Sequence, residues 1–164
     1  MGTTTQTSEE LLANSKRRIQ VADHFLTQTY QLVQDPKLLL NILDGIIKAT
    51  EEMIDAMLMH ERDTGNIPAY NETSFAAKLA LLKGELGKKY QLTQIDVHMI
   101  TEMQELIHEH KSSALEFQRK GTVVMADDDY KLSTITIDKI KTYLSRTKTL
   151  NQRIHDTIVP QRRE

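Results

Sequence analysis

One predicted helix is apolar around most of its circumference, and this feature constrains the fold of the chain more than any other. Of the 22 residues in 38–59, 14 are apolar. A helix of this kind must be covered on several sides. We therefore predict that helix 36–62 is either the central helix of a bundle or also part of an oligomer interface. Its polar residues form one narrow strip, made of Lys37, Asn41, Asp44, Lys48, Glu51, Glu52 and Asp55.

Residues that start and stop helices divide the rest of the chain. Ser8 is predicted to cap a first helix that extends to about residue 34, where Asp35-Pro36 starts the next one. Gly65 ends that helix, and a short third helix precedes the glycines at 84 and 87. Thr93 and Asp96 resemble a capping box for a fourth helix over about 94–119. The last predicted helix spans about 137–158.

The spacing of apolar residues changes after Gly121, where two β-favouring runs, 122–125 and 131–135, flank three aspartates. This pattern predicts a small hairpin. The fold class we predict is all-α, a four- or five-helix bundle with a short β-hairpin before the last helix. A length of 164 residues with 39% hydrophobic content fits one domain. We expect a disordered arm at 1–8, a single helical-bundle domain at 9–158 and a flexible tail at 159–164.

Several classes of chemistry are excluded or unsupported. The chain has no cysteine, which excludes disulfide scaffolds, zinc–thiolate sites and thiol nucleophiles. Glu105-Leu106-Ile107-His108 matches the Glu-x-x-His motif of di-iron bundles, but it occurs once and its carboxylates project to the wet side of the helix. We predict no metal, no cofactor and no identifiable small-molecule ligand. No secretory signal or membrane-spanning segment is visible, so we expect a cytoplasmic protein.

His110 is the most unusual histidine, because it lies on the apolar stripe of the fourth predicted helix with Met99, Met103, Leu106 and Phe117. A partly buried histidine is able to shuttle protons. The alternative is a structural histidine that bonds a backbone carbonyl or a neighbouring helix. Both interpretations stay open at this point.

Basic residues form a second pattern on the last predicted helix. A cationic edge at this spacing predicts contact with the phosphate backbone of a nucleic acid. The alternative is a solvated face whose cations are favoured near a helix C-terminus. The edge consists of Lys139, Arg146 and Arg153, seven residues apart, with Lys141 and Lys148 beside them.

The order of elements resembles the HEPN superfamily of helical bundles. Locally, QLVQDPKLLLNILDGIIKATEEMIDAML and EHKSSALEFQRKGTVVMADDDYKLSTITIDKIKTYL resemble small uncharacterised archaeal helical proteins. The resemblance implies that the chain forms a homodimer. It also implies that the chain is a ribonuclease or an inactive relative of one. In such ribonucleases the dimer brings together the arginine and histidine of an Arg-x(4–6)-His motif. The fourth predicted helix has no Arg followed by His, whereas Arg17 or Arg18 with His24 has this spacing on the first helix.

Two functions follow from these observations. The first is a non-enzymatic α-helical interaction module, homodimeric and HEPN-like, with RNA as a candidate partner. It depends on the apolar helix 36–62, the cationic last helix and the missing catalytic sets. The alternative is a metal-independent ribonuclease that uses His24 or His110 with Arg17 or Arg18.

Overall fold

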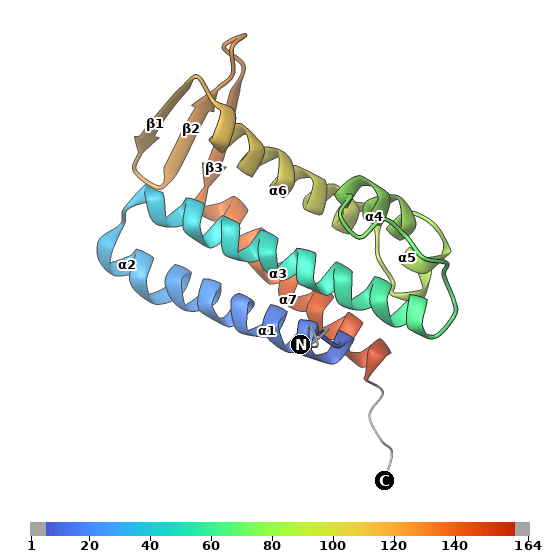
Figure 1. Ribbon diagram of the computed structural model, residues 1–164. Coiled ribbons are helices and arrows are strands. Elements are labelled where there is room, and N and C mark those ends of the chain that lie inside the picture. The colour runs from blue at the N-terminus through green and yellow to red at the C-terminus, as the bar shows by residue number, and fades with distance from the viewer. Residues whose placement is uncertain (1–5, 160–164) are drawn as a thin grey trace, which may run out of the picture.

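Three long helical elements form the core of the protein. The computed structural model describes residues 6–159, so most of the predicted arm and tail (1–5 and 160–164) lie outside it. Helix α1 (Ser8–His24) continues through a π-helical turn, η1 (Phe25–Thr29), into α2 (Tyr30–Val33). Helix α3 (Pro36–Asp63) returns antiparallel to α1, and α7 (Ile137–Ile158) packs against both (Figure 1).

Local signals explain where these helices begin and end. Thr7, one residue before the predicted cap, closes a capping box with Glu10 at the start of α1. Gln34 adopts a left-handed conformation with φ of 53° and ends α2. Asp35 then accepts a hydrogen bond from the backbone N–H of Lys37 at 2.9 Å, and Pro36 opens α3 at the predicted boundary.

Helix α3 is the central helix. It packs against α1, α7, α6 (Gln94–Ser112) and the sheet. Its buried residues recur around most of its surface, which agrees with the first of the two predictions for this helix. They are Leu39, Leu40, Ile42, Leu43, Ile46, Ile47, Ala49, Thr50, Met53, Ile54, Ala56, Met57, Leu58 and Glu61.

Two short helices, α4 (Phe75–Leu82) and α5 (Glu85–Lys89), lie at the end of the molecule opposite the sheet (Figure 1). Helix α6 follows them and begins at the predicted capping box. There Thr93 Oγ1 accepts a hydrogen bond from Asp96 N at 3.2 Å, and Asp96 Oδ2 accepts one from Thr93 N at 3.0 Å. The capping box thereby fixes the residue at which α6 begins.

The predicted all-α class is wrong, because the chain also contains a three-stranded antiparallel sheet. Strands β1 (Leu115–Arg119), β2 (Thr122–Ala126) and β3 (Leu132–Thr136) lie in that order. The prediction included β2 and β3 as a hairpin but assigned β1 to a helix reaching 119, whereas α6 ends at Ser112. Ser113 is extended, and the residues after it pair with β2. Phe117 therefore lies on a strand and not on the helical face predicted for it.

The two faces of the sheet have different surroundings. Val123, Met125 and Ile135 point into the hydrophobic core of the bundle. Val124 and Ala126 alternate with them on β2 and therefore face the other way, yet both are buried. Val124 is opposite Phe117, and Ala126 is opposite both Leu115 and Leu132. The outer face of the sheet therefore carries an apolar layer of its own.

The two ends of the described chain lie near each other. Glu9 and Leu12 of α1 line the same small pocket as His155 and Val159 at the end of α7. This end of the molecule lies away from the sheet (Figure 1). Within residues 6–159, none of the helices combines the length and the apolar character needed to cross a bilayer.

Candidate interaction surface

Exposed apolar side chains gather at the end of the molecule that carries α2 and the sheet. The β1–β2 turn lies next to α2. A Cβ atom placed on Gly121 of this turn would be 3.8 Å from the hydroxyl of Tyr30, the first residue of α2. A concentration of exposed apolar side chains at one end of a molecule identifies a candidate binding region. All the large exposed apolar residues of the described chain except Ile95 belong to this end, namely Val21, Phe25, Leu32, Val33, Leu115, Phe117, Tyr130 and Leu132.

The first part of this surface is the sheet patch, which we define as Leu115, Phe117 and Leu132 over the buried Val124 and Ala126. Leu132 is 61% exposed and Phe117 is 44% exposed. The Arg119 guanidinium lies over the Phe117 ring, 5.5 Å from its centroid. This cation–π contact holds the ring on the outer face of the sheet.

Strand β1 leaves one edge of the sheet open. It pairs with β2 on one side, and its other side has no strand within residues 6–159. All five of its residues are exposed. The Glu116 side chain is only 25% exposed, so the exposure of this residue comes largely from its main chain. An open edge presents unpaired N–H and C=O groups to any extended segment that approaches.

The second part of the surface is a groove of about 440 Å³ between α1 and the first turns of α3. Val21, Phe25 and Ile42 give the groove an apolar floor, and Arg17 and Arg18 stand at its rim. Gly45 opens it further, because a Cβ atom at this position would meet nothing within 4 Å. The groove offers an apolar surface next to positive charge.

The π-helical turn shapes the end of this groove. The Tyr30 N–H donates to the Phe25 carbonyl, five residues back, which is the hydrogen bond of a π-helix. The Thr27 hydroxyl donates to the Asp23 carbonyl at 2.8 Å. The widened turn lets Leu26 and Tyr30 stay buried while Phe25 faces the groove.

The arginine–histidine set predicted from the sequence is only partly brought together. Arg17 and Arg18 line the groove, where Arg17 bonds Asn14 and Arg18 Nε donates to Glu52 Oε1 at 2.6 Å. His24 lies on the next turns of the same helix, with its ring edge-on to Phe25 at a centroid distance of 6.5 Å. Both arginines are therefore hydrogen-bonded to side chains of α1 and α3.

His110 lies elsewhere and is not sealed in the core. Its side chain is 32% exposed, and Nδ1 is 2.6 Å from Glu116 Oε2. The histidine therefore joins the end of α6 to strand β1. Its side chain contacts this carboxylate, so the structure does not bring His110 together with Arg17 or Arg18.

The cations of α7 form two rows and not one edge. Lys139, Arg146 and Arg153 face α6, where Arg146 and Arg153 lie 3.9 and 3.5 Å from the carboxylate of Asp96. Lys139 donates to the Thr134 carbonyl at 3.1 Å and lies 4.0 Å from Glu102. The second row consists of Lys141 and Lys148, which line a groove near η1, and Lys148 pairs with Asp23 at 2.8 Å.

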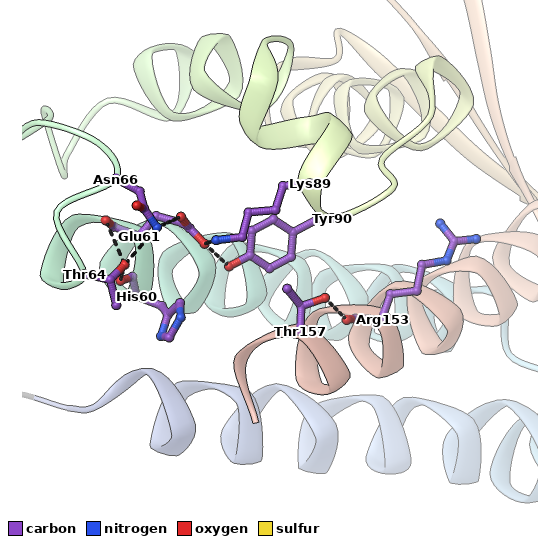
Figure 2. A network of polar contacts seen from close by, with 8 residues as sticks. All are labelled: His60, Glu61, Thr64, Asn66, Lys89, Tyr90, Arg153 and Thr157. Carbon is purple, nitrogen blue, oxygen red and sulfur yellow. Dashed lines mark hydrogen bonds and ion pairs between the residues drawn. The ribbon is translucent and has the colours of Figure 1, made fainter. Parts of the chain in front are cut away.

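A buried carboxylate that the sequence analysis missed lies at the far end of α3. Glu61 is 1% exposed, and it accepts hydrogen bonds from Lys89 Nζ at 2.6 Å, Tyr90 Oη at 2.7 Å and Asn66 Nδ2 at 2.8 Å. Figure 2 shows these three donors converging on its side chain. Burial opposes ionisation, but the hydrogen bonds from Lys89, Tyr90 and Asn66 outweigh it and lower the pKa of Glu61.

The same contacts affect Tyr90. Burial, and then the hydrogen bond to the Glu61 carboxylate, raise the pKa of the Tyr90 hydroxyl. The network ties α3 to the last residue of α5 and to Tyr90 directly after it, and we assign it a structural role. No local signal identifies it in the sequence, because Glu61 and Lys89 are 28 residues apart.

The described residues contain no group of three or more His, Asp or Glu side chains placed to hold a metal ion.

Comparisons with known proteins do not assign a family. No family model matches the chain, and no solved structure matches it. Among curated proteins, an altronate oxidoreductase of Escherichia coli O7:K1 (strain IAI39 / ExPEC) is 26% identical over 88 residues. The match covers 54% of this chain and 18% of the enzyme, so the chain corresponds to less than two thirds of that relative.

Proposed function

We propose that this protein is a non-enzymatic interaction module that works in the cytoplasm and forms a homodimer through the end that carries the sheet. The observation that supports this function is the gathering of exposed apolar side chains there, with only Ile95 elsewhere in the described chain. A chain without cysteine is compatible with a reducing compartment. The match to an oxidoreductase covers too little of that enzyme to support its reaction here.

Light scattering coupled to size-exclusion chromatography tests the proposal. We expect the wild-type chain to change from monomer to dimer between about 1 and 100 µM, the range of moderate protein–protein affinities. Phe117→Ser is expected to shift this transition to higher concentration. Ile95→Ser is the matched control, because Ile95 is also exposed but lies apart from the surface. A folded wild-type monomer over the whole range contradicts the proposal.

RNA binding is a second candidate function, which the second row of cations favours. Lys141 and Lys148 stand side by side over a groove of about 410 Å³. Lys139, Arg146 and Arg153 face acidic side chains, and Lys148 pairs with Asp23, so the charge of these four residues is partly neutralised. Phosphate contacts weaken as salt rises. The best probe is therefore Lys141→Ala, because Lys141 forms no ion pair within residues 6–159, whereas Lys148 pairs with Asp23.

We expect RNA affinity, if this function holds, to fall steeply with salt and to fall severalfold in Lys141→Ala. Binding that is absent or insensitive to salt rejects this function. The same samples test the ribonuclease alternative. Cleavage of RNA in EDTA that disappears in His24→Ala would favour a ribonuclease over a binding module.

A further inference from the structure

We propose that the seam of the homodimer is strand β1, which pairs antiparallel with β1 of a second copy to join two three-stranded sheets into one. This inference rests on the proposed function and names the surface that it uses. Strand β1 has the features of a pairing site, since its outer edge is open and all five of its residues are exposed. Sheet edges of this kind pair readily with another strand.

The sequence of β1, together with Lys120 at the start of the β1–β2 turn, favours a second copy as its occupant. In a two-fold antiparallel pair centred on Gln118, each Glu116 is opposite Lys120 of the second copy. Each Phe117 is then opposite Arg119 of the second copy. Opposite charges and cation–aromatic pairs both stabilise cross-strand neighbours. The segment Glu116-Phe117-Gln118-Arg119-Lys120 is thus complementary to itself when reversed.

Other centres of symmetry give poorer pairs. A centre at Glu116 would place two carboxylates directly opposite each other, which is destabilising. A centre at Phe117 would pair the two Phe117 rings, but it would leave Glu116 opposite Gln118 and Arg119 opposite Leu115, so that neither charge would meet an opposite charge. The Gln118 centre also permits the two glutamine amides to hydrogen-bond across the axis.

The surroundings of β1 are consistent with this register. Glu116 Oε2 bonds His110 within its own copy, so the other carboxylate oxygen remains for Lys120 of the second copy. The side chains of Phe117 and Arg119 already lie together on the outer face. Pairing at the edge would therefore continue the sheet patch from one copy to the next.

Cysteine cross-linking tests the register directly, because the chain has no cysteine of its own. In the proposed pair the two Gln118 residues face each other, at the Cα separation of about 5 Å that disulfides accept. We expect Gln118→Cys to form a covalent dimer under mild oxidation. The control is Thr149→Cys, at an exposed site of α7. We expect this variant to form at least about tenfold less covalent dimer than Gln118→Cys.

Charge reversal supplies an independent test. Lys120→Glu places like charges opposite each other twice per dimer, and we expect the dimer Kd to rise about tenfold. Adding Glu116→Lys to this variant exchanges the charges, and we expect it to restore the Kd to within about threefold of wild type. Circular dichroism checks that each variant keeps its helices.

The outcomes separate the seam from the function. A wild-type dimer in which Gln118→Cys cross-links no faster than Thr149→Cys, and in which Lys120→Glu leaves the Kd unchanged, overturns the β1 seam and leaves the interaction module standing. A wild-type chain that stays monomeric overturns both.

Discussion

At the scale of single residues, the most constrained position is the buried carboxylate of Glu61. Its three side-chain donors come from α5, from the residue that follows it and from the loop after α3. A buried charge is tolerated only when hydrogen bonds replace the water that it loses. Glu61 therefore stabilises the fold most when it is ionised.

Replacing this carboxylate should destabilise the protein in a pH-dependent way. The folded-state pKa of Glu61 lies below its ordinary value of 4.5, so its contribution is fully present above that pH and is lost as the pH falls through the lowered pKa. We expect Glu61→Gln to cost about 1–3 kcal/mol at pH 7. The difference from wild type should shrink as the pH falls below 4.5, as measured by urea unfolding.

The matched control is Glu72→Gln, which removes an exposed carboxylate beside Arg62. Exposed ion pairs contribute about 0–1 kcal/mol, so this variant should remain close to wild type. Equal effects of the two substitutions, or a Glu61→Gln difference that does not change with pH, would show that the buried network is not what stabilises this end of the fold.

Replacement by alanine should change the free energy of unfolding in opposite directions at two glycines. Gly87 is buried, and a Cβ atom there would overlap the backbone carbonyl oxygen of Leu82. We expect Gly87→Ala to destabilise the protein by about 2 kcal/mol or more. Gly45 lies inside α3 with open space around it, so Gly45→Ala should stabilise the helix by about 0.5–1 kcal/mol. Thermal unfolding of both variants measures the contrast.

At the scale of elements, the sequence allowed the helices to be predicted far better than the strand β1. The caps at Asp35 and Thr93 act through neighbours two or three residues away, so a local reading finds them. Strand β1 forms because residues 115–119 pair with 122–126. Leu115, Glu116 and Gln118 are all acceptable in a helix, and long-range pairing decides between the two structures.

The same reasoning limits what could be predicted of the candidate site. Arg17 and Arg18 were identified as polar residues of the first helix, but their groove depends on how α1 crosses α3. The α7 cations were identified by their spacing, but their division into two rows depends on Asp96 and Asp23, which belong to other elements. The sequence identifies which residues are charged, but it does not identify the residue that each of them contacts in the folded protein.

A peptide containing residues 94–120 should show whether residues 113–119 prefer a helix when they cannot pair with β2. Without β2 to pair with, we expect the helix of the peptide to extend beyond Ser112 in a helix-promoting solvent, because helix formers follow it. In the whole protein α6 ends at Ser112. Cα chemical shifts measured by NMR distinguish the two. A peptide helix that also stops at Ser112 would mean that the serines, and not the sheet, end α6.

At the scale of the whole molecule, the fold has two unlike ends. One end holds the buried polar network of α3 and α5, and the other holds the sheet patch, the open β1 edge and the groove. The core between them is shared by α1, α3 and α7. Two buried hydrogen bonds link these three helices. Asn151 Nδ2 of α7 donates to Ser15 Oγ of α1 at 3.2 Å, and Ser15 Oγ donates to the Ala49 carbonyl of α3.

If the homodimer forms, the stability of the molecule should depend on concentration. Association stabilises the folded state by mass action, so we expect Tm to rise as the protein is raised from about 1 to 100 µM. In Lys120→Glu the Tm should change less over this range. Scanning calorimetry at several concentrations makes the comparison, and a Tm that is constant in the wild type would argue against association over this range.

The closeness of the two described ends has a practical consequence. Glu9 and Val159 line one pocket, and this pole lies away from β1. A fluorescent label attached at Glu9 or Val159 would therefore lie on the side away from a β1-linked pair and leave the seam accessible. A short linker that joins the two ends would also allow circular permutation, with new termini opened in the loop between α3 and α4.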